Sequence, residues 1–328
     1  MDLSRRDLLS AAGAAALGAT LGREALAQGL EMARIVTGFA PGGSTDAVCR
    51  RVAEKLAPAY ARAVMVDNRP GAGGQIAVTH VKGAAPDGST LLLTPMAILG
   101  VYPHTYSRLA YDPVADLAPV SMAVSYDLAF AVGPMVPESV RTLPEYLAWC
   151  KGSPTRALFG SPAMGSTLHF TGILLGRAAG VELTHVGFRG AQAAMMDLIG
   201  GQIPAVCAPV GDLLKYATAG KCRLLGTSGA LRSRFTPNVA TFAEQGYKDM
   251  AFSEWYGFYL PARASAAAVQ KLNTALRQAL TAPEVSEALA QLGLEAKPSS
   301  PQQLAAALKA DAQRWGAVVR SIGFSAES

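Results

Sequence analysis

Apolar residues recur in short runs that alternate with segments of helical spacing along most of the chain. Ile35–Val36 is the centre of one such run, and a Pro-Gly-Gly turn at residues 41–43 ends it. After the turn, Val48, Val52 and Leu56 are spaced four residues apart, on one face of a helix. The pattern predicts a buried strand, a glycine-rich turn and a helix in succession.

The same succession recurs further along the chain. We expect strands at 63–66, 90–93, 128–132, 157–159, 183–186, 203–208 and 223–227, and helices at 75–81, 143–150, from 167 onward, and at 191–199. The last third is predicted to be mostly helical, with Gly323 as a helix stop.

Repeated strand, turn and helix are typical of βαβ units in a parallel sheet, which binds ligands beyond the carboxyl ends of its strands. The pattern breaks near residues 111–113 and then starts again, which separates two such blocks. The sequence therefore predicts an α/β fold of two lobes with a ligand cleft between them.

The first residues have the features of an export signal and are set apart from the fold. Arg5 and Arg6 form a twin-arginine pattern, an apolar stretch runs to Leu21, and Ala25–Ala27 offers small residues for cleavage. The apolar stretch is too short and too weak to anchor the chain in a bilayer. We expect residues 1–27 to be removed and the protein to reach the periplasm by the twin-arginine route; an uncleaved N-terminal helix is the alternative.

Composition narrows the classes of partner and chemistry. The formal charge of +5 is modest, and Lys and Arg are dispersed without interleaved aromatics, which argues against nucleic-acid binding. None of the four cysteines forms a C-x-x-C pair or has a histidine at metal-ligand spacing, so no metal is predicted. The glycines at residues 71–74 lack the spacing of a dinucleotide fingerprint and no phosphate-binding G-K-[ST] motif occurs, so no cofactor is predicted. A disulfide between Cys207 and Cys222 is an alternative to four small buried thiols.

The turn at residues 39–46 is the most informative candidate site. It directs free backbone N–H groups and the positive end of a helix dipole at one spot, which attracts an anion. Asp46 is not expected to touch that anion with its charge; it caps the helix or orders the turn at Gly42 and Gly43. The alternative is an ordinary strand–turn–helix connection that binds no ligand.

A second glycine-containing turn lies at residues 160–166. Its hydroxyls, at Ser161 and Ser166, could bind a carboxylate without any catalytic group. His169 follows three residues later, but a nucleophilic Ser–His pair also needs an orienting acid and an oxyanion site. We therefore favour a histidine that fixes its own loop by hydrogen bonds. Arg189, on a later turn, either pairs with a second carboxylate or lies free on the surface.

Taken together, the motifs resemble those of one family. In chain order they are Phe39–Asp46, Val66–Gly74, Pro86–Leu92, Tyr111–Pro113, Leu117–Val120, Gly165–Ser166 with His169, Leu198–Gln202, Trp255–Gly257 and Pro261. The set is similar to that of the Bug family, the TctC-like periplasmic solute-binding proteins of tripartite tricarboxylate transporters. The resemblance covers essentially the whole mature chain.

The resemblance implies a Venus-flytrap fold, a type II periplasmic binding protein with its ligand cleft between two α/β domains. Residues 28–122 with 255–328 would form domain 1, and residues 123–254 domain 2. It implies a monomer that is not an enzyme. The protein would capture a small carboxylate, which could be an aromatic or dicarboxylic acid, and would deliver it in a transient contact to membrane transporter subunits. One alternative is a ligand-sensing protein for a membrane receptor kinase, and another is a hydrolase that uses Ser166 and His169.

The resemblance also implies the residues of the site. The two opposing turns would hold one carboxylate, partly through ordered waters, and the rest of the pocket would set specificity. Met164 adds apolar bulk and Phe188 lacks the hydroxyl that is usual in the family, which favours an apolar or aromatic acid over citrate. The implied ligand-binding residues are Phe39, Ala40, Gly42, Gly43, Ser44, Thr45, Asp46, Thr94, Pro95, Met96, Ser161, Met164, Gly165, Ser166, His169, Phe188, Arg189, Gly190 and Pro209.

Overall fold

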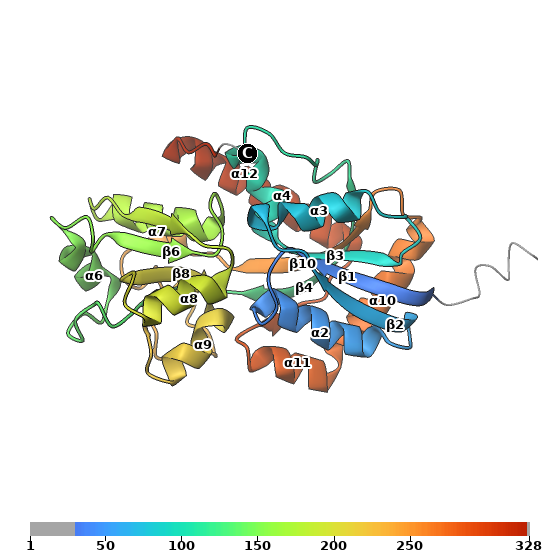
Figure 1. Cartoon of the computed structure of the whole chain (residues 1–328), viewed down its shortest axis with the longest axis horizontal. Helices are drawn as coiled ribbons and strands as arrows, with labels where there is room; N and C mark the ends of the chain where they lie inside the picture. The colour runs from blue at the N-terminus through green and yellow to red at the C-terminus, as the bar shows by residue number, and fades with distance from the viewer. Residues whose placement is uncertain (1–29, 327–328) are drawn as a thin grey trace, which may run out of the picture.

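The structure, a computed structural model, describes residues 30–326 of the 328-residue chain. These residues form two lobes, each a mixed α/β unit built on one sheet (Figure 1). The predicted export signal at 1–27 lies outside the described residues. No helix between residues 30 and 326 is long and apolar enough to cross a membrane.

The first lobe contains a six-stranded sheet in the order β11-β4-β10-β3-β1-β2. Three of its strands run parallel, namely β1 (Leu30–Thr37), β2 (Ala61–Asn68) and β3 (Thr90–Pro95). The helices α2 (Ser44–Leu56) and α3 (Gln75–Lys82) connect them, which confirms the βαβ units predicted from apolar spacing. The remaining helices of this lobe are α4 (Met96–Gly100), α5 (Tyr102–Thr105), α10 (Ala266–Thr281), α11 (Pro283–Ala290) and α12 (Pro301–Ile322), with a 3-10 turn η1 at Ala72–Gly74.

The other half of this sheet is antiparallel, so the expectation of a parallel sheet is wrong there. It consists of β4 (Leu117–Tyr126), β10 (Glu254–Pro261) and the short β11 (Glu295–Ala296). The sequence pattern missed β4 and β10. All eight residues of β10 are buried, so polar and apolar positions do not alternate along it, and it contains Gly257 and Pro261, which ordinarily interrupt strands.

The second lobe contains a five-stranded sheet in the order β7-β6-β8-β5-β9. Its strands are β5 (Leu128–Val132), β6 (Leu158–Ser161), β7 (Thr184–Gly187), β8 (Ala205–Pro209) and β9 (Arg223–Thr227). Its helices are α6 (Leu143–Cys150), α7 (Thr167–Ala178), α8 (Ala191–Ile199) and α9 (Val210–Thr218), with a 3-10 turn η2 at Lys248–Met250. β6 is parallel to β7 and β8, whereas β5 is antiparallel to β8 and β9. The bounds predicted for β5, α6, α8 and β9 are confirmed.

Two segments of chain cross between the lobes. Only Asp127 separates the end of β4 in one sheet from the start of β5 in the other. The returning segment enters the first sheet at Glu254, which pairs with Tyr126. A domain boundary between residues 122 and 123 would therefore cut through β4, because pairing with β10 keeps this strand in the first sheet up to Tyr126.

Both sheets are covered by helices, and the core fills the space between these layers (Figure 1). All four cysteines are free and buried in it, as the thiol alternative predicted, and the disulfide alternative is wrong. Gly323 caps α12 with a φ of 70°, so the predicted helix stop is confirmed. The carboxyl ends of β1, β3, β6 and β8 lead to residues that line one cavity between the lobes.

Candidate functional site

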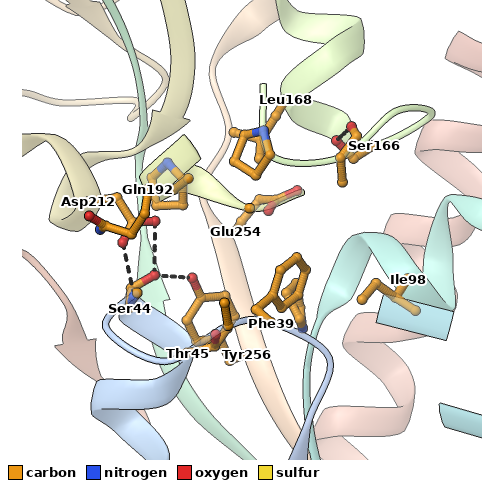
Figure 2. A pocket seen from close by; sticks show the side chains of 18 of the residues that line it. Phe39, Ser44, Thr45, Ile98, Ser166, Leu168, Gln192, Asp212, Glu254 and Tyr256 are labelled. Atoms are coloured by element: carbon orange, nitrogen blue, oxygen red, sulfur yellow. Dashed lines mark hydrogen bonds between the residues drawn. The ribbon is translucent and has the colours of Figure 1, made fainter. Parts of the chain in front are cut away.

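A cavity of about 70 Å³ lies between the lobes, and both lobes contribute to its walls (Figure 2). Ten of the residues predicted for the site line it: Phe39, Ala40, Gly43, Ser44, Thr45, Pro95, Ser166, Arg189, Gly190 and Pro209. Residues that the sequence analysis did not select also line it: Ile98, Tyr102, Tyr126, Pro162, Ala163, Leu168, Ala191, Gln192, Asp212, Glu254 and Tyr256.

Four helices of eight or more residues begin at this cavity. The residues that precede α2, α7, α8 and α9 are Gly43, Ser166, Gly190 and Pro209, and all four line the cavity. None of these helices has a side-chain cap, so side chains of the N-cap residues do not occupy their first N–H groups. The described helices with side-chain caps, α6, α10 and α12, begin elsewhere. The positive ends of four helix dipoles are therefore directed at the cavity.

Asp46 lies beneath the first turn rather than in the cavity. Its Oδ2 accepts hydrogen bonds from the Gly42 N–H at 3.0 Å and from Arg50 Nε at 2.9 Å, and its Oδ1 accepts one from Asn68 Nδ2 at 3.0 Å. Burial alone would raise the pKa of Asp46, but hydrogen bonds from Arg50, Gly42 and Asn68 outweigh it and lower that pKa. Asp46 thus orders the turn, which is one of the two roles considered for it, and does not line the cavity as the site list implied.

His169 has the corresponding position beneath the second turn. Its Nδ1 accepts the Gly165 N–H at 3.2 Å, so it fixes its own loop as favoured above. Ser166 Oγ donates to the Ala163 carbonyl at 2.7 Å rather than to His169, so the Ser–His pair that the hydrolase alternative requires is not formed. The histidine that does contact a serine is His185, whose Nε2 lies 2.7 Å from Ser161 Oγ.

Both histidines are neutral near neutral pH. Burial lowers the pKa of His169 to about 4, and burial together with the neighbouring His169 lowers that of His185 to about 3. The two rings stack with their centroids 3.9 Å apart.

The other predicted residues lie around the cavity rather than in its wall. Thr94 and Met96 are buried at the end of β3 and the start of α4. The Gly42 carbonyl accepts a hydrogen bond from Gln192 Nε2 at 3.5 Å, between the lobes. Met164 and Phe188 line an adjoining groove of about 850 Å³, which shares Phe39, Pro162, Ala163, Arg189 and Gly190 with the cavity.

Asp212, a residue that the sequence analysis missed, reaches across from α9 to the first lobe. Its Oδ1 accepts the Ser44 N–H at 2.9 Å, and its Oδ2 lies 3.3 Å from the Ser44 hydroxyl (Figure 2). The same hydroxyl is 2.7 Å from Tyr256 OH. Burial raises the pKa of Asp212 to about 6, although hydrogen bonds from Ser44 and the charge of Lys215 lower it in part.

Glu254, the second missed acid, lies at the point where the chain re-enters the first sheet. Its Oε2 accepts a hydrogen bond from Tyr126 OH at 2.8 Å, and its Oε1 accepts one from Thr167 Oγ1 of the second lobe. Burial raises the pKa of Glu254 to about 7. An acid at the head of an otherwise apolar, aromatic strand was the sequence feature that could have revealed it. Asp212 carried no such indication, because an acid in the first turn of a helix is ordinary.

Comparisons with known proteins agree with this architecture. The profile of the TctC family, described as "Tripartite tricarboxylate transporter family receptor", matches residues 48–324. Protein BugT of Bordetella pertussis is 31% identical over 291 residues, which are 88% of this chain and 89% of BugT.

Two similar solved structures are named with a bound carboxylate. An adipate-bound R. palustris protein is 26% identical with a TM-score of 0.85, over 90% of this chain and 98% of its own. Malate-bound MatC of Rhodopseudomonas palustris is 28% identical with a TM-score of 0.81, over 88% of this chain and 98% of its own. The predicted two-domain type II fold is confirmed.

Proposed function

This chain belongs to the TctC family of periplasmic solute-binding proteins, which are not enzymes, and we propose that it captures a small carboxylate between its lobes and delivers it to a tripartite tricarboxylate transporter. The observation that carries the proposal is the convergence of the N-termini of α2, α7, α8 and α9 on one interlobe cavity, although Asp212 Oδ1 and the Asp127 carbonyl already accept the first N–H groups of α2 and α9. Such N-termini bind anions through backbone N–H groups and the helix dipole. The adipate and malate bound by two structural neighbours support a carboxylate as the anion.

The free donors of the cavity suggest where the carboxylate is held. Asp212 already accepts the Ser44 N–H, so the contribution of the first lobe falls to Thr45. Thr45 lines the cavity and is only 5% exposed. On the second lobe, Ala191 and Gln192 begin α8 at the cavity wall. We infer that the carboxylate lies between these two helix N-termini, with Arg189 at the mouth.

Ligand capture is tested by calorimetric titration. Residues 28–328 are titrated with a panel of mono- and dicarboxylates. Gly43 has ordinary extended backbone angles, and a Cβ placed on it would meet nothing closer than Asp212 Oδ1 at 3.9 Å. Gly43→Val should therefore fold, while its methyl groups occupy the cavity and weaken binding at least tenfold. Gly83→Val is the matched control, because Gly83 has a φ of −87° and similar space but lies at the end of α3.

Delivery is tested in cells. Deleting the gene should abolish high-affinity uptake of the acid that binds in vitro, and the wild type or Gly83→Val should restore it, whereas Gly43→Val should not. Binding in vitro without any uptake defect would contradict the transport role and leave the binding role intact.

A further inference from the structure

The end of α12 reaches from the first lobe to the second, outside the ligand cavity. Most of this helix packs on α4, α5 and β4 of the first lobe, but its last turn lies beside α7 of the second (Figure 1). Arg177 of α7 donates hydrogen bonds to the carbonyls of Ser321 and Ile322, at 3.0 and 2.8 Å. Such final carbonyls lack partners within a helix and lie at the negative end of its dipole, so a guanidinium fixes them well.

Beyond α12 the chain returns to the first lobe. Gly323 ends the helix with a φ of 70°, which redirects the chain. Ala326 then forms a bridge to the end of α5: its N–H donates to the Thr105 carbonyl at 2.6 Å, and its carbonyl accepts the Ser107 N–H at 3.4 Å. The segment of residues 321–326 is therefore attached to both lobes.

Within this segment, Phe324 contacts the residue that holds the second turn. Its ring lies at 85° to that of His169, with the centroids 4.9 Å apart, which is an edge-to-face arrangement. Nδ1 of the same imidazole accepts the Gly165 N–H at 3.2 Å. Because His185 stacks on the imidazole and Phe324 lies across it, the two rings hold it in the orientation that points Nδ1 at the turn.

The second turn also contacts the first lobe directly. Tyr106 OH donates to the Met164 carbonyl at 3.3 Å, and a Cβ placed on Gly165 would meet Thr105 Oγ1 at 3.3 Å. Thr105 and Tyr106 belong to the same stretch of chain to which Ala326 is attached. The first lobe therefore supports the second turn twice, through Tyr106 and through Phe324, and hinge opening of the lobes would remove both supports.

We propose that Phe324 is a positioning residue of the ligand site, which acts through His169 to order the second turn while the lobes are together. The inference rests on the proposed capture function, because it assigns control of one wall of that site to a residue that lines neither the cavity nor the adjoining groove. Ser166, which precedes α7 and lines the cavity, directly follows Gly165. Order at Gly165 therefore sets the position of the helix start that faces the ligand.

Amide hydrogen exchange of the ligand-free protein tests the positioning role. In Phe324→Ala, the Gly165 N–H should exchange about tenfold faster than in the wild type, as it should in His169→Ala. Phe324→Tyr keeps the ring and should restore the wild-type rate, since a groove of about 510 Å³ beside Phe324 has room for the hydroxyl. The Gly42 N–H, which Asp46 holds in the first turn, is the internal control and should keep its rate.

Calorimetry with the tightest-binding acid of the panel tests the consequence for the ligand. Phe324→Ala should lower affinity about threefold, and it should have no further effect when combined with His169→Ala, because both act through one hydrogen bond. Trp149→Ala is the matched control and should bind as the wild type does. Trp149 is also a partly buried aromatic residue, but it packs on Tyr146 in α6, outside the cavity.

Three results would overturn the inference: an unchanged exchange rate at Gly165 in Phe324→Ala, an equal rise at Gly165 and Gly42, or additive effects of Phe324→Ala and His169→Ala on affinity. Phe324→Leu, which keeps apolar volume without a ring, provides the same test if the alanine variant does not fold. Failure of every acid to bind the wild type would instead overturn the proposed function, and the exchange rates would still decide the positioning role.

Discussion

The two turns that face the cavity are held in place by different chemistry. On the first lobe, the ionised Asp46 accepts three hydrogen bonds, one of them from the guanidinium of Arg50. On the second lobe, the neutral His169 accepts a single hydrogen bond from the Gly165 N–H and stacks on His185. Both residues support the backbone from behind, and neither lines the cavity. The most recognisable polar residues of each motif therefore support the turns without lining the cavity.

The largest effect is expected from Asp46→Ala. It leaves the Gly42 N–H, the Asn68 amide and the Arg50 guanidinium without their acceptor, so the first turn should lose its order. We expect ligand affinity to fall about 100-fold, which corresponds to about 2.7 kcal/mol, while the protein still folds. Calorimetry and thermal unfolding measure the two quantities. Unchanged affinity would show that the turn does not depend on its charged support.

A smaller effect is expected from His169→Ala. The second turn loses one neutral hydrogen bond, and a net contribution of about 1 kcal/mol is typical of such a bond. Affinity should fall about fivefold by the same titration, less than for Asp46→Ala. His169→Gln, which keeps an acceptor, serves as the rescue variant. A loss equal to that of Asp46→Ala would remove the distinction between charged and neutral support.

Acidification should weaken the supports of the two turns over different pH ranges. The pKa values of His169 and His185 are lower in the folded protein than the ordinary 6.5, so their contribution to stability is complete above pH 6.5 and declines as the pH falls toward 4 and 3. The contribution of Asp46, whose folded pKa is lowered from 3.8, should decline only below that value.

Urea unfolding at pH 8, 6 and 5 checks this difference. The stability of the wild type relative to a variant with both His169→Gln and His185→Gln should decrease from pH 8 to pH 5. The stability of the wild type relative to Asp46→Asn should stay constant from pH 8 to pH 5. Asp212 and Glu254 also titrate here, but they are present in all three proteins and cancel in the differences. If the difference in free energy of unfolding between the wild type and the histidine variant instead increased from pH 8 to pH 5, the rings would not be neutral in the folded protein.

The smallest effect is expected from Arg50→Ala. The Arg50 side chain is 54% exposed, and solvent screens its ion pair with Asp46. Two other donors continue to hold that carboxylate. Affinity should change less than threefold in the titration used for Asp46→Ala. A loss approaching 100-fold would place the support of the turn in the ion pair instead of in the hydrogen bonds from Gly42 and Asn68.

The comparison of the turns also shows what the sequence could reveal. Apolar spacing predicted the parallel strands and their helices, because a βαβ unit is a local pattern of strand, turn and helix. The motif residues Gly43, Ser44 and Ser166 were found at helix starts for the same reason. Local patterns also pointed to Asp46 and His169, which lie beneath the two turns that face the cavity rather than in its wall.

The rest of the cavity wall depends on pairings far apart in the chain. Ser44 contacts Asp212 over a separation of 168 residues and Tyr256 over one of 212. Glu254 meets Thr167 only because β10 crosses back between the lobes. No spacing rule brings such residues together, since their proximity follows from how the two sheets are connected. The antiparallel strands β4 and β10, which make that connection, are also the strands that apolar periodicity did not predict.

The most direct test of the account is a crystal structure of the mature protein with the tightest-binding acid from the calorimetric panel. We predict that the ligand carboxylate lies between the lobes, within about 2.7–3.2 Å of donors at the start of α2 and at the start of α8. Thr45 should be among these donors, and Asp46 and His169 should remain beneath their turns without touching the ligand. A carboxylate bound outside the cavity, or held through Asp46 or His169, would contradict the account.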